Sequence, residues 1–533
     1  MEEFAKLCCH IVEDYYGSFL AQIFRQLAQL GRLSIQQLAQ KCRLPLRQVK
    51  VGVGTLIQLR LVYHHTTYEG LSTYQADTTY AYNIMRTGRL VELVEWSLGA
   101  SAAGIMETLA AMGFATAHEL EAEVLEKSDP THPMGKSRFQ TLLKQLVSSG
   151  YIKAVREAHF QSPSDRRQDV ERSLRDNGLI PTGTGKKIAA DAESRIDSEL
   201  ERRVNSSVSA YDVSQELTRS PTQDNTTLSV DYSNLIIRIR NDRVAGMAEK
   251  VFGKQIAQVA RAACSQITDV DPRSLPVRLV ENPANAVQRL DAAKLCSGVF
   301  HGKANGGGRP NGTNGHHSDQ PNGATGEDRI IEHHLAVLAE GNFTFLLQEP
   351  NNSKSWSINK RKFTNFLRDK EIYRLIGESM TEPALRVVRM LADKGKLDER
   401  TMLDIGLLNA KELRKCLSAL QTMGFLELQE VPKDPQRQPK NTIFLYFHDA
   451  ERVQKVFLDK LYKTMSRMYE RLHLERDKVA STLSKVERLE DGTEVEILPA
   501  AELQELYRWR QKESWFTTEI HRIDESIAIL RDI

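Results

Sequence analysis

A glycine-rich stretch of the chain carries part of a phosphate-binding motif. Gly183-Thr184-Gly185-Lys186-Lys187 has two glycines followed by two lysines. In a complete loop, backbone N–H groups surround the phosphates and a Ser or Thr hydroxyl holds magnesium. Here Ile180 stands where the first glycine belongs and Lys187 stands where the hydroxyl belongs. We therefore expect a flexible loop and no nucleotide site.

Histidines and aspartates also occur in groups that could hold a metal ion. Neighbouring residues point in different directions on a strand or helix, whereas a metal ion needs ligands that converge on one point. Asp269-Val270-Asp271 precedes Pro272, which favours a turn. The adjacent histidine pairs have no recurring Cys or acidic partner; they are His64-His65, His316-His317 and His333-His334.

Other catalytic signatures are absent from the sequence. The six cysteines form no C-x-x-C pair and no zinc-binding spacing, which fits a reducing compartment. No nucleophile elbow, H-E-x-x-H or kinase signature occurs. We predict that the chain is not an enzyme and has no metal site and no cofactor.

Basic side chains give the remaining candidate chemistry, which is contact with nucleic-acid phosphates. The candidates are Arg43, Arg47, Lys50, Arg60, Lys136, Arg138, Lys144, Lys360, Arg361, Lys362, Arg414, Lys415, Lys433, Arg437 and Lys440. They include no cluster of Asn, Gln and Arg of the kind that reads bases. The net charge of +2 gives no bulk attraction to nucleic acid, and exposed helices carry Lys and Arg for solvation alone. We expect local, non-specific DNA contact at most.

Four stretches that hold these residues share one pattern: an apolar-faced helix, a stop and a β-prone hairpin. The stops are Arg60, Gly150, Asn342 and Gly424, and Gly or Asn tolerates the left-handed conformation that ends a helix. Leu or Val lies seven and four residues before each stop, and an apolar residue follows it. A third helix followed by a two-stranded ribbon is the winged variant of the helix-turn-helix.

The predicted architecture is mainly α with small β wings. At 533 residues the chain is too long for one core. We expect winged helices at 1–82, 83–160, 227–378 and 379–448, a polar insertion or linker at 161–226, and a coiled-coil hairpin at 449–533. The stretch 161–226 is expected to be partly disordered, and so is the Gly/Asn-rich loop 302–326, because such compositions bury little apolar area.

Local signals add detail to the first and third modules. A helix break is predicted at Gly17-Ser18, and Ser34 is predicted to cap a short helix. Asn234–Ile239 is predicted to be a strand that opens the third module.

Heptad spacing begins after His448. Apolar residues repeat at three-four intervals with one step empty at Glu475, and a turn is expected at Asp491-Gly492. The residues expected to pack in an antiparallel coiled coil are Leu458, Leu461, Met465, Met468, Leu472, Ile520, Ile523 and Ile527. The alternative is that these two helices pack onto the rest of the chain. No apolar stretch is long enough to cross a bilayer, so we expect no membrane insertion.

In this order of elements the chain resembles the large winged-helix subunit of RNA polymerase III, a member of its three-subunit initiation subcomplex. The most specific segments are 409–413, 426–433 and 444–446, and the segments 7–16 and 48–50 are also similar. The resemblance covers nearly the whole chain in order, except 161–226 and 302–326.

The resemblance implies a nuclear, non-catalytic subunit that helps recruit the polymerase to promoters and open the DNA of tRNA, 5S rRNA and other short genes. Its implied partners are two subcomplex subunits, the core clamp, a promoter-bound initiation factor and DNA bound non-specifically. Two alternatives remain: a winged-helix scaffold of another assembly, such as a cullin-like or proteasome-lid-like protein, or a free-standing transcription factor.

Overall fold

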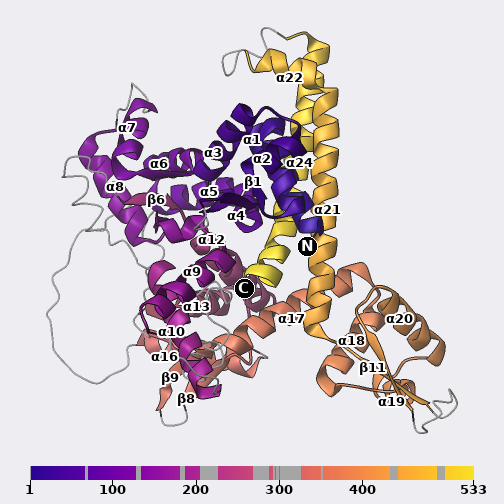
Figure 1. Cartoon of the computed structure of the whole chain (residues 1–533). Coiled ribbons are helices and arrows are strands. Elements are labelled where there is room, and N and C mark those ends of the chain that lie inside the picture. Colours follow the sequence, from indigo (N-terminus) through magenta and orange to yellow (C-terminus); the bar gives the residue numbers. More distant parts are fainter. Residues whose placement is uncertain are drawn as a thin grey trace. The chain divides into compact units, whose positions relative to one another are not determined.

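The computed structural model describes residues 2–66, 70–127, 134–179, 186–204, 226–267, 287–291, 294–295, 299, 326–341, 343–349, 352–432, 442–488 and 498–533. Across these residues the chain is mainly helical with four small antiparallel sheets, as predicted (Figure 1). It divides into two compact units. Unit 1 comprises Met1–Leu235 and Tyr462–Thr518, and unit 2 comprises Ile236–Leu461 and Glu519–Ile533.

The first sheet of unit 1 has the strand order β1-β3-β2. Helix α1 (Glu2–Leu30) is kinked at Gly17, where φ is 83°, so the predicted break is confirmed. Ser34 and Gln37 form a capping box, which confirms the predicted cap. The other elements are β1 (Leu33–Ser34), α2 (Ile35–Cys42), α3 (Leu46–Gln58), β2 (Val62–Thr66) and β3 (Ser72–Ala76).

The second sheet of unit 1 is completed by a strand that follows the polar stretch. Strand β6 (Thr227–Val230) pairs with both β4 (Phe114–Thr116) and β5 (Ile152–Val155). Residues 161–226 therefore lie between two strands of one sheet, as an insertion into its hairpin. The accompanying helices are α4 (Thr78–Asn83), η1 (Ile84–Arg86), α5 (Thr87–Leu98), α6 (Ala100–Met112), α7 (Ala117–Lys127), α8 (Lys136–Ser148), η2 (Glu157–Phe160), α9 (Pro163–Asp176) and α10 (Lys186–Val204).

The predicted strand at Asn234–Ile239 is wrong, because these residues belong to helix α12 (Ser233–Phe252). Leu235, Ile236 and Ile239 are buried, which is the spacing of one helix face and not of a strand. Asp231 caps the helix start through the Ser233 N–H at 3.2 Å. The β-prone composition is thus overridden by the helical spacing of the buried residues and by the cap.

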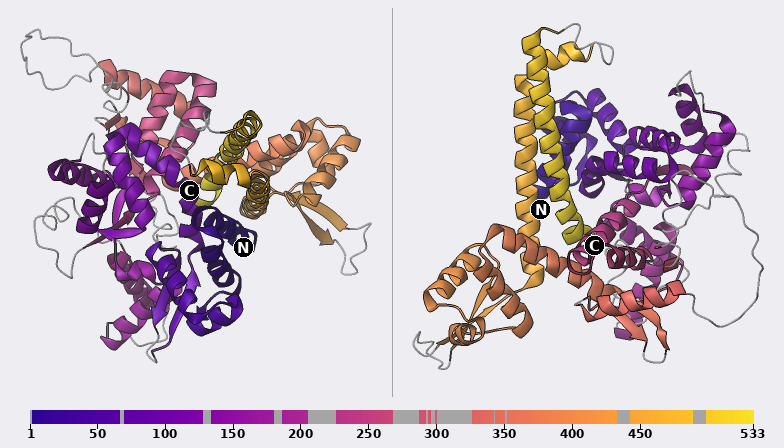
Figure 2. Two further views of the ribbon diagram at one scale, coloured as in Figure 1. Left: turned by 90° about the horizontal axis from the view of Figure 1, so that it is seen from above. Right: turned by 180° about the vertical axis from the view of Figure 1, so that it is seen from behind.

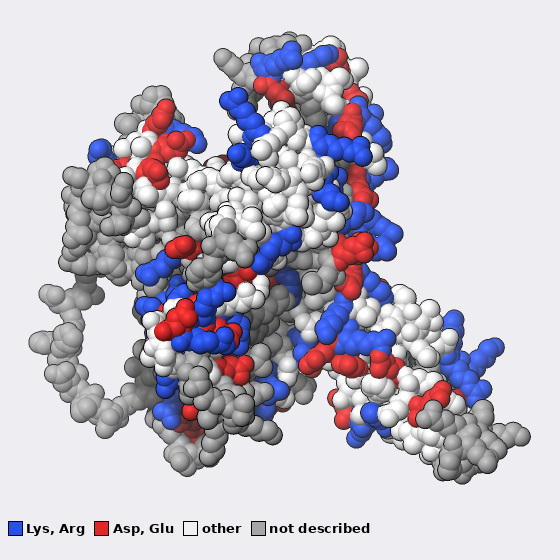
Figure 3. All heavy atoms as spheres, in the orientation of Figure 1, with Lys and Arg blue, Asp and Glu red and all other residues white. Residues whose placement is uncertain are grey.

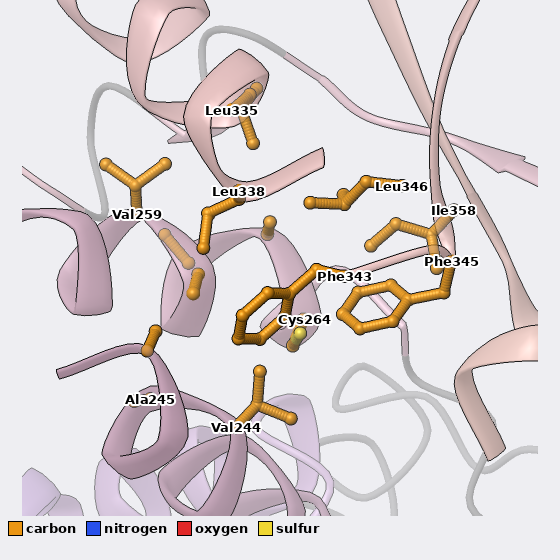
Figure 4. Packing of buried hydrophobic residues seen from close by; sticks show 14 of the residues in the cluster. Val244, Ala245, Val259, Cys264, Leu335, Leu338, Phe343, Phe345, Leu346 and Ile358 are labelled. Carbon is orange, nitrogen blue, oxygen red and sulfur yellow. The ribbon is translucent and has the colours of Figure 1, made fainter. Parts of the chain in front are cut away.

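The third sheet, in unit 2, has the order β7-β9-β8 and covers an apolar core. Figure 4 shows that Phe343, Phe345 and Ile358 from the sheet side meet Val244 and Leu338 from the helices. The elements are α13 (Lys254–Ser265), β7 (Val287–Arg289), α16 (Gly326–Glu340), β8 (Leu346–Glu349) and β9 (Asn352–Asn359). The predicted loop 302–326 lies almost entirely outside the described residues.

The fourth sheet pairs β10 (Glu427–Pro432) with β11 (Thr442–Phe447), and Leu397 adds a single bridge to Tyr446. Its helices are α17 (Lys360–Ser379), α18 (Glu382–Lys394), α19 (Glu399–Gly406) and α20 (Ala410–Thr422). Asn409 caps α20 by accepting from the Lys411 N–H at 3.3 Å.

Helices α21 (Ala450–Lys478) and α24 (Ala500–Ile527) are long and run side by side (Figures 1 and 2). A further helix, α22 (Ala480–Val486), follows α21, and the chain ends in a helical turn, η5 (Ala528–Asp532). Within unit 1 the contacts of α24 proceed in antiparallel order. Lys512 Nζ of α24 lies 2.8 Å from Glu475 of α21, and Lys485 Nζ of α22 lies 2.6 Å from Glu502 of α24. No described helix is both long and apolar enough to cross a membrane.

The predicted helix stops are confirmed wherever the structure describes them. Arg60, Gly150 and Gly424 have φ values of 59°, 73° and 80°, and the chain enters a strand within three residues of each. Asn342 lies outside the described residues, although the Phe343 N–H still donates to Leu338 O at 3.3 Å.

Two cores of unit 2 share a helix and a terminal segment. Phe363 and Leu367 of α17 are buried in the third core, and Ile372 and Ile376 of the same helix are buried in the fourth. In the same way Ile529 belongs to the third core and Leu530 to the fourth. These shared elements hold the two cores of unit 2 together.

We predict that Leu530→Ala destabilises unit 2 by about 2–4 kcal/mol, because it leaves a cavity in a closely packed core. Leu530 is only 1% exposed. The midpoint of urea unfolding and hydrogen exchange in α17 and α20 measure the effect. Leu407→Ala is the matched control, since Leu407 is 88% exposed. Equal effects of the two substitutions would contradict the shared-core description.

Candidate nucleic-acid interface

Helix α3 presents basic and apolar side chains on one exposed face. Arg47 and Lys50 are three residues apart and both are exposed, so they lie on the same side of the helix. Leu46 and Val51 flank them and are 42% and 63% exposed. Arg43, also exposed, ends α2 with a φ of 54°. This surface could bind phosphates, but its apolar part also suits a protein partner.

The hairpin β2–β3 that follows α3 is covered by helix α9 of the insertion. Arg32 reaches Asp165 at 2.7 Å, and the Asp165 side chain is only 4% exposed. His65 on β2 lies 3.4 Å from Asp169. This contact, which the sequence did not predict, covers part of the sheet β1-β3-β2, whose strand residues are mostly half-buried, while Arg47 and Lys50 of α3 remain exposed.

The structure removes Arg60 from the candidate DNA contacts. Its guanidinium donates to Ser229 Oγ at 3.1 Å and lies 4.6 Å from the centre of the Tyr80 ring. Nearby, burial raises the pKa of Asp77 above its ordinary value and also raises the pKa of Tyr63. Arg60 therefore joins the end of α3 to strand β6 inside unit 1, because its side chain is directed into this polar network and away from solvent.

The basic residues of α8 are exposed but do not share one face. Lys136, Arg138 and Lys144 all face solvent. At 100° per residue, Arg138 points away from the two lysines. Its guanidinium also donates to Ser101 Oγ at 3.0 Å. Only Lys136 and Lys144 lie close enough in direction to contact one nucleic-acid strand together.

Lys360, Arg361 and Lys362 form the first turn of α17. Asn359 caps this turn by accepting from the Lys362 N–H at 3.0 Å. The N-terminus of a helix carries a partial positive charge, which is unfavourable for these three cations. An anion bound nearby would relieve that repulsion. Lys362 also borders a shallow cavity of about 330 Å³; the other lining residues are Thr344, Asn365, Phe366, Asp369, Lys370 and Tyr373.

Two of the predicted candidates, Arg414 and Lys415, lie on α20. Lys415 is exposed. Arg414 is also exposed, but its Nε lies 2.6 Å from Glu399, which neutralises it locally. The predicted hairpin residues Lys433, Arg437 and Lys440 lie outside the described residues.

The predicted coiled-coil residues pack in two places. Leu458 and Leu461 contact the fourth core in unit 2, and Ile527 is fully buried. Leu472 packs in unit 1 with Val479 and Trp509, so that it joins α21 to α24. Glu475, the polar gap in the heptads, accepts from Lys512 of α24. Met465 and Ile520 are also buried, and Met468 and Ile523 are half-buried.

A polar cluster between α1 and α21 was not predicted. Ligand-type atoms of His10, Glu13 and His473 lie within 4.8 Å of one another, an arrangement that could hold a metal ion. Arg25 lies 3.1 Å from Glu13, and Lys6 lies 2.7 Å from Glu470. Because these cations already neutralise the carboxylates, the cluster acts as an ion-pair contact between the two helices. The signal in the sequence is a His and a Glu three residues apart on each helix.

The histidine pairs singled out in the sequence do not converge. His64 and His65 lie on β2, and His65 faces Asp169. His333 and His334 lie on α16 with ring centres 6.2 Å apart. His316-His317, Asp269-Asp271 and Gly183–Gly185 lie outside the described residues. Among the described residues, the one cluster of metal-ligand type is the α1–α21 cluster.

The described surface shows no large field of one charge sign on the face drawn in Figure 3. Lys and Arg alternate with Asp and Glu along the outer side of α21. This mixture agrees with the formal net charge of +2. Attraction to nucleic acid must therefore come from small groups such as Arg47 with Lys50.

Comparison with known families identifies the class of protein. A model of a C-terminal winged-helix domain, described as that of POLR3C, matches residues 372–448. The helix-turn-helix domain of RNA polymerase III subunit RPC82 matches residues 6–67, and the model of subunit RPC82 matches 141–349. The chain is thus a winged-helix protein of the transcription machinery.

Relatives that match along nearly their whole length are found among fungi. DNA-directed RNA polymerase III subunit rpc3 of Aspergillus terreus is 30% identical over 99% of both chains, and that of Aspergillus niger gives the same values. Subunit RPC-3 of Coccidioides immitis is 29% identical over 99% of both chains. The chain belongs to the RPC82 (rpc3) family of RNA polymerase III subunits.

We predict that Asp165→Asn loosens α9 from the sheet β1-β3-β2, because Arg32 lies directly before β1. Loss of the charged partner of Arg32 should lower the free energy of local opening by about 1–3 kcal/mol. Hydrogen exchange in β2 and β3 should become faster. Asp176→Asn, an exposed site on the same helix, is the control. Unchanged exchange in the Asp165 variant would show that the contact is not stabilising.

We predict that the α1–α21 contact weakens as the pH falls below about 6.5. Burial is the main cause that lowers the pKa of His10, outweighing the nearby Glu470 and Glu13. The unfolded chain then binds this proton more readily, so acid favours opening. Thermal unfolding between pH 7.5 and 5.5 should show less pH dependence in His10→Gln than in His333→Gln. Stabilisation by acid would contradict this, since it would require an imidazolium held by the carboxylates.

Proposed function

We propose that the chain is a non-catalytic subunit of RNA polymerase III that acts in transcription initiation in the nucleus. Its likeness to rpc3 proteins along 99% of both chains carries this proposal. The work of such a subunit is promoter recruitment and DNA opening for tRNA, 5S rRNA and other short genes. The partners we propose are two initiation-subcomplex subunits, the core clamp and a promoter-bound initiation factor. No active site, metal or cofactor of its own is needed for this work.

The architecture that we propose for this function is four winged helices in tandem and a coiled-coil hairpin. Four sheets preceded by helices support it, and so do the antiparallel contacts of α24 with α21 and α22. The proposed modules lie within 1–82, 83–230, 233–378 and 379–448, and the hairpin lies within 449–533. The second module extends beyond residue 160 because β6 belongs to its sheet. This division also makes 161–226 an insertion of the second module.

Two groups of basic residues support a non-specific contact with DNA. Arg47 and Lys50 share an exposed face of α3, and the cations of the first turn of α17 lie where an anion would relieve helix-dipole repulsion. Neither group carries the side chains that read base edges. The DNA contact would therefore be mostly with phosphates, on a duplex that the polymerase already holds. The rest of the binding energy would come from docking to other subunits.

Double substitution of Arg47 and Lys50 by Ala should weaken binding of duplex DNA equally for all sequences. The slope of log affinity against log salt should fall by about two, one for each lost phosphate contact. Fluorescence anisotropy of the full chain at several salt concentrations measures this. Arg414→Ala is the control and should change the slope less, because Glu399 already neutralises Arg414. An unchanged slope in the double variant would rule out DNA contact at α3.

We also expect less than a tenfold preference for any one sequence, about 1.4 kcal/mol, against about 4–10 kcal/mol for specific readers. Competition with promoter and random duplexes measures the preference. A large preference would favour a free-standing transcription factor.

Purification of the native complex tests the proposed polymerase subunit directly, since a lone monomer or dimer would contradict it.

A further inference from the structure

The outward face of α24 in unit 1 forms a continuous exposed stripe. Its members are three or four residues apart, so they lie on one side of the helix. All of them are exposed; they are Gln504, Tyr507, Arg508, Gln511, Ser514, Trp515 and Thr518, and we call them the α24 stripe. Tyr507 is 53% exposed and Trp515 is 57% exposed. Two large aromatic side chains thus face solvent about 12 Å apart along the helix.

The acidic residues of the same segment are turned toward the neighbouring helices. Glu502 pairs with Lys485 at 2.6 Å, and Glu513 lies 3.6 Å from Arg476. Glu505 accepts from Thr482 at 3.1 Å. These three are the acidic residues between positions 500 and 518. The stripe itself contains no carboxylate, and Arg508 gives it a positive charge.

The buried side of this helix is already satisfied within the chain. Leu506 and Trp509 are 1% and 3% exposed, and Phe516 packs against the cluster that Trp509 forms with Leu472 of α21. Trp515 also contacts the Phe516 ring edge-on, with the ring centres 5.0 Å apart. Tyr507 and Trp515 nevertheless leave more than half of their surface exposed, so this surface is accessible to a partner.

The chemistry of the stripe favours a protein partner over nucleic acid. Tyr, Trp and Arg are the residue types that dominate binding energy at protein interfaces. Nucleic acid would require several cations along the face to neutralise successive phosphates, and the stripe offers Arg508 alone. Charge complementarity therefore selects an acidic protein surface, with apolar side chains between Tyr507 and Trp515 and a carboxylate opposite Arg508.

We propose that the α24 stripe is a docking surface for an acidic segment of another protein chain. The proposal deepens the proposed function, because within a polymerase that chain would be another subunit. The stripe is nevertheless defined by its own chemistry, so it is testable in whichever complex the protein enters.

The experiment places a photoreactive amino acid at Gln511, the middle of the stripe, in the full chain expressed in its own cells. After irradiation, mass spectrometry identifies the crosslinked peptide. We expect one adduct to another protein, on a peptide with more Asp and Glu than Lys and Arg. The same photoreactive residue at Asp477, exposed on α21, is the control position and should give no such adduct.

Substitutions then test which side chains bind. Trp515→Ala and Arg508→Glu should each lower the adduct yield about tenfold or more, as expected of central interface residues. Arg467→Glu, an equal charge reversal at an exposed site of α21, should leave the yield unchanged. Circular dichroism of the purified variants checks that they remain folded, as the exposure of these side chains predicts.

Four results would overturn the proposal: no adduct, an adduct to nucleic acid, an adduct to another part of this chain, or an adduct to a basic peptide. Co-purification of polymerase subunits with the same irradiated chain is scored separately. If those subunits are present and the stripe gives no adduct, the docking surface is wrong and the proposed function stands. If they are absent, the proposed function fails, and the adduct still decides the stripe.

Discussion

Two backbone hydrogen bonds at the end of a helix determine where the strand that follows α3, α8 or α20 begins. After α3, the Leu61 N–H donates to Leu56 O at 2.8 Å and the Arg60 N–H donates to Ile57 O at 2.9 Å. The same pair of bonds closes α8 and α20. The first donor of each pair, which is Arg60, Gly150 or Gly424, has a positive φ that reverses the chain, so that the apolar residue after it packs under the helix. This geometry fixes the angle between helix and hairpin, and hence which face of α3, α8 or α20 remains exposed to bind a partner.

Larger contacts then tie these small modules into two units. In unit 1 helix α9 is tied to Arg32 beside strand β1, and Arg60 at the end of α3 reaches strand β6 of the second sheet. In unit 2 one helix, α17, contributes to two cores. Each module alone would bury little apolar surface, so these shared elements supply stability that a single three-helix module lacks. The exposed candidate residues therefore lie on helices that are packed into one of the two units.

The local part of this structure could be predicted from the sequence and the non-local part could not. Gly150, Gly424 and Ser34 act through hydrogen bonds to residues within five positions, so their pattern is readable in sequence. The contact of Arg32 with Asp165 spans 133 positions, and nothing local signals it. The strand prediction at Asn234–Ile239 was wrong because it relied on the β-prone residue types and not on the helical spacing of the buried side chains. Among the basic candidates, sequence could place Arg47 and Lys50 on a helix but could not show that Arg60 turns inward.

The sharing of Ile529 and Leu530 between two cores has a consequence for biosynthesis. Residues 236–461 of unit 2 leave the ribosome well before residues 519–533 do, and until then both cores lack a wall. The two cores of nascent unit 2 therefore stay incomplete, with apolar surface exposed, while α21 and α24 are translated. A chaperone that shields that surface during elongation would be needed most over this interval.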